Sequence, residues 1–262
     1  MSQNSIVIWA VVASVLLGLP GAVRADKIVK TDGREISGLK IKWFASRQEY
    51  QVDQADGTML AVPADEVDSL QITKPAEFDK AAQACAAKQF EVAIPILEDV
   101  IGRYKRLQWD GIASELLAKA YLGKGDFKKA AQVLSGIMEG SAKNLVTDDQ
   151  YNLYWTALAG AQMNAVLKQS LSEAIAGDSR PLAALALIKR ADLSKGDGKR
   201  DDAALDYLRS ILVYSDVAAF QAEALFKAAQ LFEEMRDPRA EELRKRLRAN
   251  YPDSPYARKL GG

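Results

Sequence analysis

Two patterns of hydrophobic positions divide the chain. From Asp26 to about Lys74, apolar, β-branched and aromatic residues alternate with polar ones, with the period of two that is typical of half-buried strands. After Pro75 the period becomes 3.6, in segments rich in Ala and Leu with short polar breaks, and it remains so to the end. The change in period predicts a small antiparallel β domain over 26–75 and a helical domain over 76–262.

Turn signals place the strands of the β domain. Asp32-Gly33 and Asp56-Gly57 each lie between two extended runs, which is the strongest short-range signal of a hairpin. The pattern predicts five short strands, near 27–31, 34–44, 48–53, 58–62 and 68–73. Before the last strand, "VPADEV" predicts a single helical turn, because Pro63 fixes φ. Five strands in so short a segment predict a strongly bent sheet or a small barrel.

The helical domain shows a repeat. Its periodicity predicts about ten helices, near 76–88, 90–104, 108–123, 127–139, 148–162, 165–176, 181–195, 201–214, 217–235 and 238–249. Four alanines on the second helices of successive pairs lie 37, 73 and 37 residues apart: Ala93, Ala130, Ala203 and Ala240. Twelve residues before each of them stands another alanine: Ala81, Ala118, Ala191 and Ala228. Small residues on both helices of a hairpin let the backbones approach closely, so the spacing predicts repeated antiparallel pairs.

The interval of 73 predicts one further pair. Its second helix should carry the repeated position near residue 166, where Ala165-Val166 begin a helix, and Tyr154 then occupies the small-residue position of the first helix. Thr147 with Gln150 predicts a capping box at the start of this pair, and Pro181 is expected in the first turn of a later helix.

The stretch "GKGDFKKAAQVL", residues 123–134, suggests either a phosphate-binding loop or a helix corner. The P-loop spacing fails, because no Ser or Thr follows the Lys and a helix precedes the stretch. We therefore expect Gly125 to make the turn, Asp126 to cap the next helix, and Ala130 to let the pair close.

The repeated pattern resembles the tetratricopeptide repeat (TPR), a helix-turn-helix unit that here is slightly long. The positions that carry the resemblance are Leu117, Ala118, Tyr121 and Ala130 in one repeat and Ala228, Leu231, Ala240 and Pro252 in another. The resemblance implies a mainly α fold, an α-solenoid of about five TPR-like repeats preceded by the β domain. It also implies a concave face, lined by the first helix of each pair, that binds a peptide or protein.

The resemblance further implies which residues on that face contact the partner: Glu115, Lys119, Asp148, Tyr151, Trp155, Asp192 and Phe232. For the aromatic set Tyr151, Tyr154 and Trp155, which share one helix face, core packing is the default explanation and contact with a peptide is the alternative.

The pattern "DGREISG…DGTMLAVPADEVDSLQI" resembles the SH3-like or Sm-like small β-barrels that precede helical repeats in many exported bacterial proteins. Such a barrel implies a shape and no particular activity.

Composition argues against catalysis and metal binding. The 262 residues include no His, which removes the usual general base and transition-metal ligand. Acidic pairs such as Asp201-Asp202 are adjacent on helices and so do not point to one site. "DLSKGDGKRDDA" lacks the spacing of a calcium loop, and Cys85, the single cysteine, is expected to be a small buried apolar residue. We expect no cofactor, no metal and no enzymatic site.

The formal charge is balanced, with 35 basic and 35 acidic residues, whereas a nucleic-acid-binding domain is usually basic. The run "RAEELRKRLRAN" is explained as the solvated face of a terminal helix, although it could also meet an acidic partner or anionic lipid. We therefore expect a protein or peptide partner and no nucleic acid.

The first 25 residues are typical of an export signal. An apolar run over 6–19 is followed by Pro20-Gly21 and by a cleavage site after Ala25. No Lys or Arg precedes the run, so an uncleaved inner-membrane anchor over 6–23 stays open as the alternative.

The sequence therefore predicts an exported, periplasmic, non-enzymatic scaffold of the bacterial envelope. The β domain is then a docking or capping module. A membrane-anchored envelope-assembly adaptor is the alternative, and an enzyme with an unrecognised site is the least favoured hypothesis.

Overall fold

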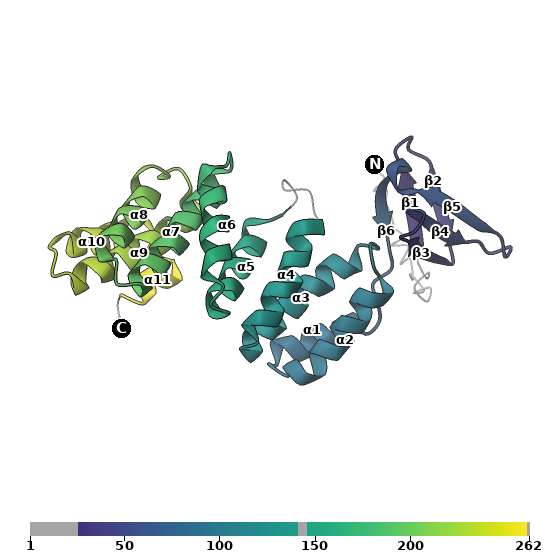
Figure 1. Cartoon of the computed structure of the whole chain (residues 1–262), viewed down its shortest axis with the longest axis horizontal. Helices are drawn as coiled ribbons and strands as arrows, with labels where there is room; N and C mark the ends of the chain where they lie inside the picture. Colours follow the sequence, from purple (N-terminus) through teal and green to yellow (C-terminus); the bar gives the residue numbers. More distant parts are fainter. Residues whose placement is uncertain (1–25, 141–145, 261–262) are drawn as a thin grey trace, which may run out of the picture. The chain divides into compact units, whose positions relative to one another are not determined.

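The computed structural model describes residues 26–140 and 146–260. The expected export signal, residues 1–25, lies outside the described residues. The chain forms two compact units, one ending at Thr73 and the other starting at Lys74 (Figure 1). Each unit has its own core, and each is described separately below.

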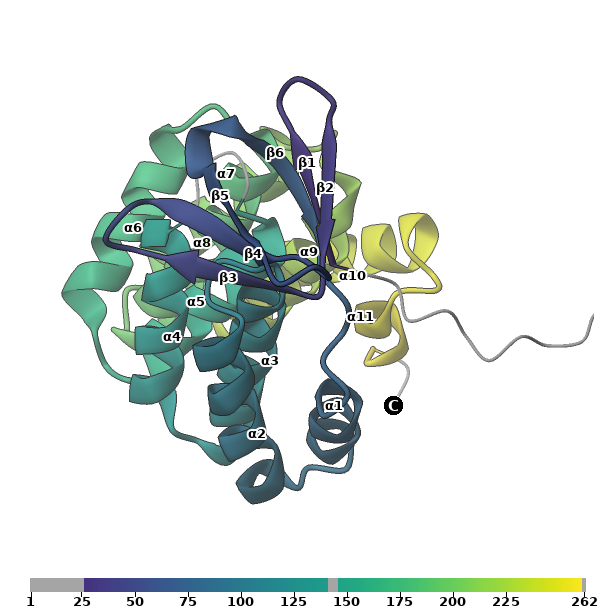
Figure 2. The ribbon, with the colours of Figure 1, turned by 90° about the vertical axis from the view of Figure 1, so that its right-hand side faces the viewer.

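The first unit consists of two antiparallel sheets with three strands each, in the orders β2-β1-β6 and β3-β4-β5 (Figure 2). The strands are β1 (Asp26–Lys30), β2 (Glu35–Gly38), β3 (Lys40–Phe44), β4 (Glu49–Asp53), β5 (Met59–Pro63) and β6 (Val67–Gln71). The expected hairpin turns are confirmed, because Gly33 and Gly57 adopt φ of 83° and 85°. The expected helical turn is the 3₁₀ segment η1 (Ala64–Glu66).

The single strand expected over 34–44 is wrong in one respect, since it divides into β2 and β3 on either side of Leu39. β2 pairs with β1 in one sheet, whereas β3 pairs with β4 in the other. The division lies at Gly38, where an added Cβ would overlap the side chain of Val52 and the backbone oxygen of Asp53. Only a glycine lets the chain pass this close to β4 while it changes sheets.

The second unit is a series of antiparallel helix pairs (Figure 1). The five pairs are α1 (Phe78–Ala86) with α2 (Phe90–Arg103), α3 (Trp109–Lys124) with α4 (Phe127–Gly140), α5 (Asp148–Gly160) with α6 (Asn164–Ala176), α7 (Arg180–Gly196) with α8 (Arg200–Leu212), and α9 (Ala218–Glu234) with α10 (Arg239–Asn250). A short helix, α11 (Pro255–Arg258), follows them. The expected fold class, a mainly α solenoid of five TPR-like repeats after a small β unit, is confirmed.

Each pair turns through the same backbone corner. One or two residues after the first helix, each of the five pairs has a left-handed residue, with φ of 58° at Lys88, 84° at Gly125, 57° at Gln162, 76° at Gly198 and 58° at Arg236. At every corner the next N–H donates to the carbonyl five residues earlier, as Asp126 does to Tyr121 at 2.9 Å. This is the Schellman arrangement, which satisfies the last carbonyls of a helix. The glycine of "GKGD" is therefore a corner residue, as expected.

Local capping also agrees with the sequence. Thr147 Oγ1 accepts from the N–H of Gln150 at 3.2 Å, and Gln150 Oε1 accepts from the N–H of Thr147 at 3.0 Å, which completes the capping box. Pro181 lies in the first turn of α7, and Asp126 Oδ1 accepts from the N–H of Lys129 at 3.2 Å at the start of α4.

The register expected for the third pair is wrong by one residue. The repeated second-helix position lies five residues after the left-handed corner, at Ala93 and Ala130, and this places it at Leu167 and not at Val166. Leu167 is buried, whereas Val166 is exposed. The first-helix position, twelve residues earlier, is Trp155. The third pair therefore holds two large side chains where the other pairs hold two alanines.

Aromatic rings occupy the space beside glycines where successive helix pairs pack together. The ring of Phe90, at the start of α2, lies where a Cβ on Gly123 of α3 would be, and the ring of Phe127 has the same relation to Gly160 of α5. Cys85, expected to be buried, is only half-buried and packs beside the first core, where burial raises the pKa of its thiol.

We predict that Gln162→Gly stabilises the protein. A non-glycine residue in the left-handed region costs about 1 kcal/mol, although glycine also gains entropy in the unfolded chain. The net increase in the free energy of unfolding should be about 0.5 kcal/mol, measured by urea unfolding. Gly125→Ala, at the same place in another corner, should decrease it, and a decrease for both variants would contradict the role of the corner.

Candidate functional site

A pocket of about 310 Å³ lies between the first helices of the third and fourth pairs. We call it the α5–α7 pocket. Its walls come from three helices and the corner after α7: Trp155, Thr156, Ala159, Leu167, Lys189, Asp192, Leu193, Gly196 and Asp197. Two of the residues expected to contact a partner, Trp155 and Asp192, belong to it.

The apolar part of the pocket is made by the two large residues of the third pair. Trp155 is only 1% exposed, and its indole Nε1–H donates to Ser170 Oγ at 2.8 Å. This bond fixes the ring between α5 and α6. Leu167 is buried beside it. The pocket therefore has a rigid apolar wall that follows directly from the unusual residues of this pair.

Asp192 is held by other groups of the chain. Its Oδ1 accepts from the hydroxyl of Tyr207 at 2.6 Å, and its Oδ2 accepts from Lys227 Nζ at 2.6 Å. Lys227 also bridges to Glu223 at 2.6 Å. Burial, followed by the charge of Asp192 and their hydrogen bond, raises the pKa of Tyr207, which therefore remains a donor. Asp192 is thus part of a closed network.

Lys189 lies one turn before Asp192 on α7 and, unlike Asp192, makes no ion pair with the described residues. It is half-buried, and among the described residues no carboxylate lies within 4.0 Å of its ammonium. Burial is the main cause that lowers its pKa, and repulsion from Lys227 adds to the effect, while the charges of Glu223 and Asp192 oppose it. A half-buried ammonium with no direct ion pair is costly, so the pocket contains a cation that can still donate hydrogen bonds to a ligand.

This arrangement can bind an anion but has no obvious chemistry of its own. Lys189 can donate to a carboxylate that enters the pocket, and Trp155 and Leu193 give apolar contact to the atoms that carry it. The carboxylates nearby are engaged elsewhere: Asp192 by Lys227, and Asp197 by Lys168 at 3.5 Å. Within the described residues, no three His, Cys, Asp or Glu side chains form a group that could hold a metal ion.

Two of the expected contact residues are not surface residues. Trp155 and Phe232 are each 1% exposed, so neither is available on an exposed face. Trp155 packs inward because the true register places it at the contact between α5 and α6. Phe232 belongs to the second core, and the guanidinium of Arg239 lies over its ring at 4.4 Å.

The other expected residues lie at or near the surface on α3 and α5. Glu115 pairs with Lys119 at 2.6 Å and accepts from Gln150 at 3.3 Å, so its carboxylate ties α3 to α5. Tyr151 is half-buried, with its ring 5.5 Å from that of Trp155. Burial raises the pKa of the half-buried Asp148, with its neighbour Asp149 contributing. No observation assigns a partner to these residues.

Sequence reasoning missed Lys189, the one pocket residue with an unused charge. It stands in "LAALALIKRADL", where only its place in an apolar run distinguishes it from other lysines. Periodicity alone could have indicated that this lysine is partly enclosed.

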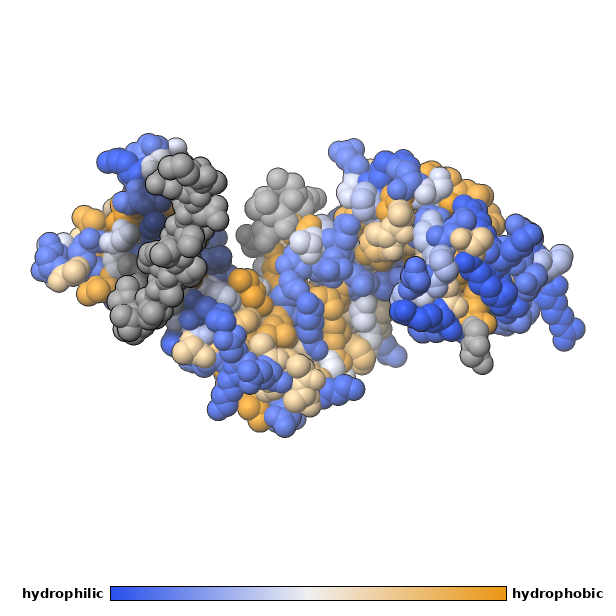
Figure 3. Space-filling view, turned by 180° about the vertical axis from the view of Figure 1, so that it is seen from behind, coloured by the Kyte–Doolittle hydropathy of each residue, from blue (hydrophilic) through white to orange (hydrophobic). Residues whose placement is uncertain are grey.

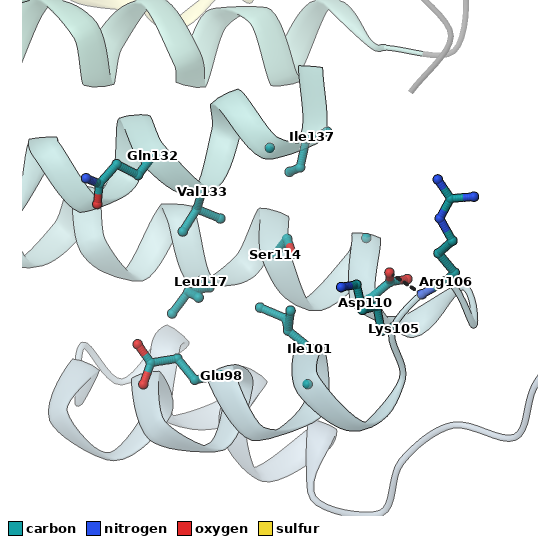
Figure 4. Close-up of a pocket in the computed structure, with 13 residues that line it drawn as sticks. Glu98, Ile101, Lys105, Arg106, Asp110, Ser114, Leu117, Gln132, Val133 and Ile137 are labelled. Carbon is teal, nitrogen blue, oxygen red and sulfur yellow. Dashed lines mark hydrogen bonds between the residues drawn. The ribbon is translucent and has the colours of Figure 1, made fainter. Parts of the chain in front are cut away.

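A second hollow lies between the second helices of the first two pairs, α2 and α4, whereas the α5–α7 pocket lies between first helices. We call it the α2–α4 groove. It measures about 770 Å³, with α3 as its floor. Figure 4 shows Ile101 from α2, Leu117 from α3, and Val133 and Ile137 from α4 around the same space. In Figure 4 the side chain of Arg106 points away from it, and its backbone N–H donates to Asp110 at 2.6 Å.

No family model matches the chain, and no curated protein matches it. A similar solved structure is the crystal structure of YrrB, a TPR protein with an unusual peptide-binding site. The match has 15% sequence identity, a TM-score of 0.41, and coverage of 70% of this chain and 89% of that chain. A match at this level carries no argument about the site, and the repeat assignment rests on the five helix pairs and their identical corners.

No helix within residues 26–140 and 146–260 is long and apolar enough to cross a bilayer.

We predict that Lys189→Met stabilises the free protein at pH 7. Because the pKa of Lys189 in the folded state lies below the ordinary 10.5, the ammonium costs folding free energy at neutral pH. The cost is lost as the pH rises through the folded pKa toward 10.5. The difference between variant and wild type in urea unfolding should therefore shrink between pH 7 and pH 10. The exposed Lys245→Met serves as the control, and a difference independent of pH would contradict the prediction.

Proposed function

We propose that the protein is a non-catalytic interaction scaffold whose helical repeats hold a segment of another protein at the α5–α7 pocket. The observation that carries the proposal is Lys189, a half-buried ammonium that makes no ion pair within 4.0 Å among the described residues and lies in a pocket with an apolar wall. A group that costs stability and faces a pocket is typical of a binding site. The partner then supplies an acidic group next to apolar atoms.

The pocket lies on the face made by first helices, which supports binding on that face. Helix pairs that contact mainly their neighbours leave one row of helices free for a ligand. Contacts on α3 and α5, at Lys119 and Tyr151, would extend the site along the row.

The place of action that we propose is the periplasm, with the scaffold serving the cell envelope. The support is the signal-like composition of residues 1–25. We further propose that the β unit docks or caps the scaffold. Its two sheets share one bent segment at Gly38, which is compatible with an SH3-like barrel.

The binding function is tested by in vivo crosslinking and affinity capture from the native envelope. We expect Lys189→Met to reduce the yield of the specific crosslinked partner at least tenfold, because a charge-assisted hydrogen bond in a pocket is lost. Lys245→Met, with the same change on exposed α10, should keep the full yield. Equal recovery with both variants would rule out the α5–α7 pocket as the binding site.

The location is tested separately by mass spectrometry of the mature N-terminus. A chain that begins at Asp26 supports export with cleavage. An intact Met1 on a membrane-bound chain supports the anchored adaptor.

A further inference from the structure

Two apolar features of the helical unit have no role in the proposed function. One is the α2–α4 groove, and the other is a stripe on α8. Leu205 and Leu212 of α8 are 54% and 62% exposed, and the partly buried Leu208 lies between them. At spacings of three and four residues these side chains form one line along the helix. Figure 3 shows hydrophobic residues of this unit at the surface among hydrophilic ones.

The α8 stripe is unusual for its position. α8 is the second helix of its pair, and it buries Ala203, Tyr207 and Ile211 against its neighbours. The leucines of the stripe lie on its outer side, where a helix of a soluble repeat is normally polar. Exposed leucines that line up on a helix are typical of a docking face.

The groove offers the complementary shape. Ile101, Val133 and Ile137 are partly exposed along it, on α2 and α4. Glycines stand on the same walls, and an added Cβ at Gly102 or Gly136 would meet no atom within 4 Å. The fold therefore does not need glycine there, and the missing side chains leave room for a helix to approach between α2 and α4.

The charges at the ends of the two features are also complementary. Lys105 lies at the α2–α3 end of the groove, is exposed, and has no ion pair with the described residues. Asp201 lies on α8 one turn before Leu205, is exposed, and likewise has no ion pair among them. The acidic Asp201 at the start of the α8 stripe is therefore complementary in charge to the basic Lys105 at one end of the groove.

We propose that the α8 stripe of one molecule docks in the α2–α4 groove of a second copy, with Asp201 directed toward Lys105. The two features cannot meet within one molecule, because α5, α6 and α7 separate them in the stack. The contact joins different surfaces of the two copies and is therefore head-to-tail, so one copy retains a free groove and the other a free stripe. The assembly grows beyond a dimer as the concentration rises.

One helix in one groove is a small interface, so we expect association at concentrations on the order of 10–100 µM. Sedimentation velocity of the full mature chain should show a sedimentation coefficient that increases over this range. A monomer throughout the range would overturn the proposal.

Two variants block opposite sides of the contact. Leu205→Glu places a charge in the stripe, and Gly136→Trp fills the groove at an open position. Each variant alone should remain monomeric at 100 µM. An equimolar mixture should form a 1:1 dimer that does not grow, because one intact stripe and one intact groove remain. Self-association of either variant alone, or a mixture that stays monomeric, would contradict the head-to-tail contact.

Controls separate this proposal from folding and from the proposed function. Leu39→Glu, on a residue of the β unit that is 74% exposed, should leave association unchanged. Lys189→Met should do the same, since it lies in the other pocket. If the helical circular dichroism shows that a blocking variant does not fold, the mixing experiment is done with Lys105→Glu and Asp201→Lys instead. Each charge variant alone should weaken association, and their mixture should restore it in both directions, because every contact between the two different variants pairs an acid with a base.

Discussion

Close contact between the two helices of a pair is the constraint on which the helical unit depends. A single amphipathic helix cannot bury its apolar face, and two helices bury it well only where small side chains let the backbones approach. Ala81 and Ala93 in the first pair, and Ala118 and Ala130 in the second, meet this condition and are fully buried. The left-handed corner at the end of each first helix holds the pairs in the same geometry, so that one pair becomes the packing surface of the next.

The third pair departs from that rule, and the departure creates the candidate site. Trp155 and Leu167 occupy the positions of the two alanines, and α5 and α6 pack less closely than the helices of the other pairs. The indole is fixed by Ser170, and the space beside it opens toward α7. The pocket is therefore the consequence of two large residues at positions made for small ones. Its charge comes from α7, which contributes Lys189 on the other wall.

Much of the fold could be predicted from the sequence because local signals determine it. Gly125, the capping box at Thr147 and the two Asp-Gly hairpins act within a few residues, and each is found as expected. The register of the third pair could not be predicted, because small residues mark the two repeat positions of the other pairs and the third pair has Trp155 and Leu167 there. The burial of Phe232 depends on α10 and Arg239, and the isolation of Lys189 depends on which carboxylates are taken by Lys227. Both are facts of packing between helices that periodicity cannot reveal.

α7 belongs to two cores. Leu185 and Ala186 pack in the first core, whereas Ile188 and Ala191 pack in the second. The stack therefore has a joint at this helix, because the helices before it and after it bury their side chains in different clusters. Bending of the stack is easiest at such a joint, where few side chains span both sides. Lys189 stands at the boundary between the two clusters, so a ligand held by it and by Trp155 would span the joint and stiffen the stack.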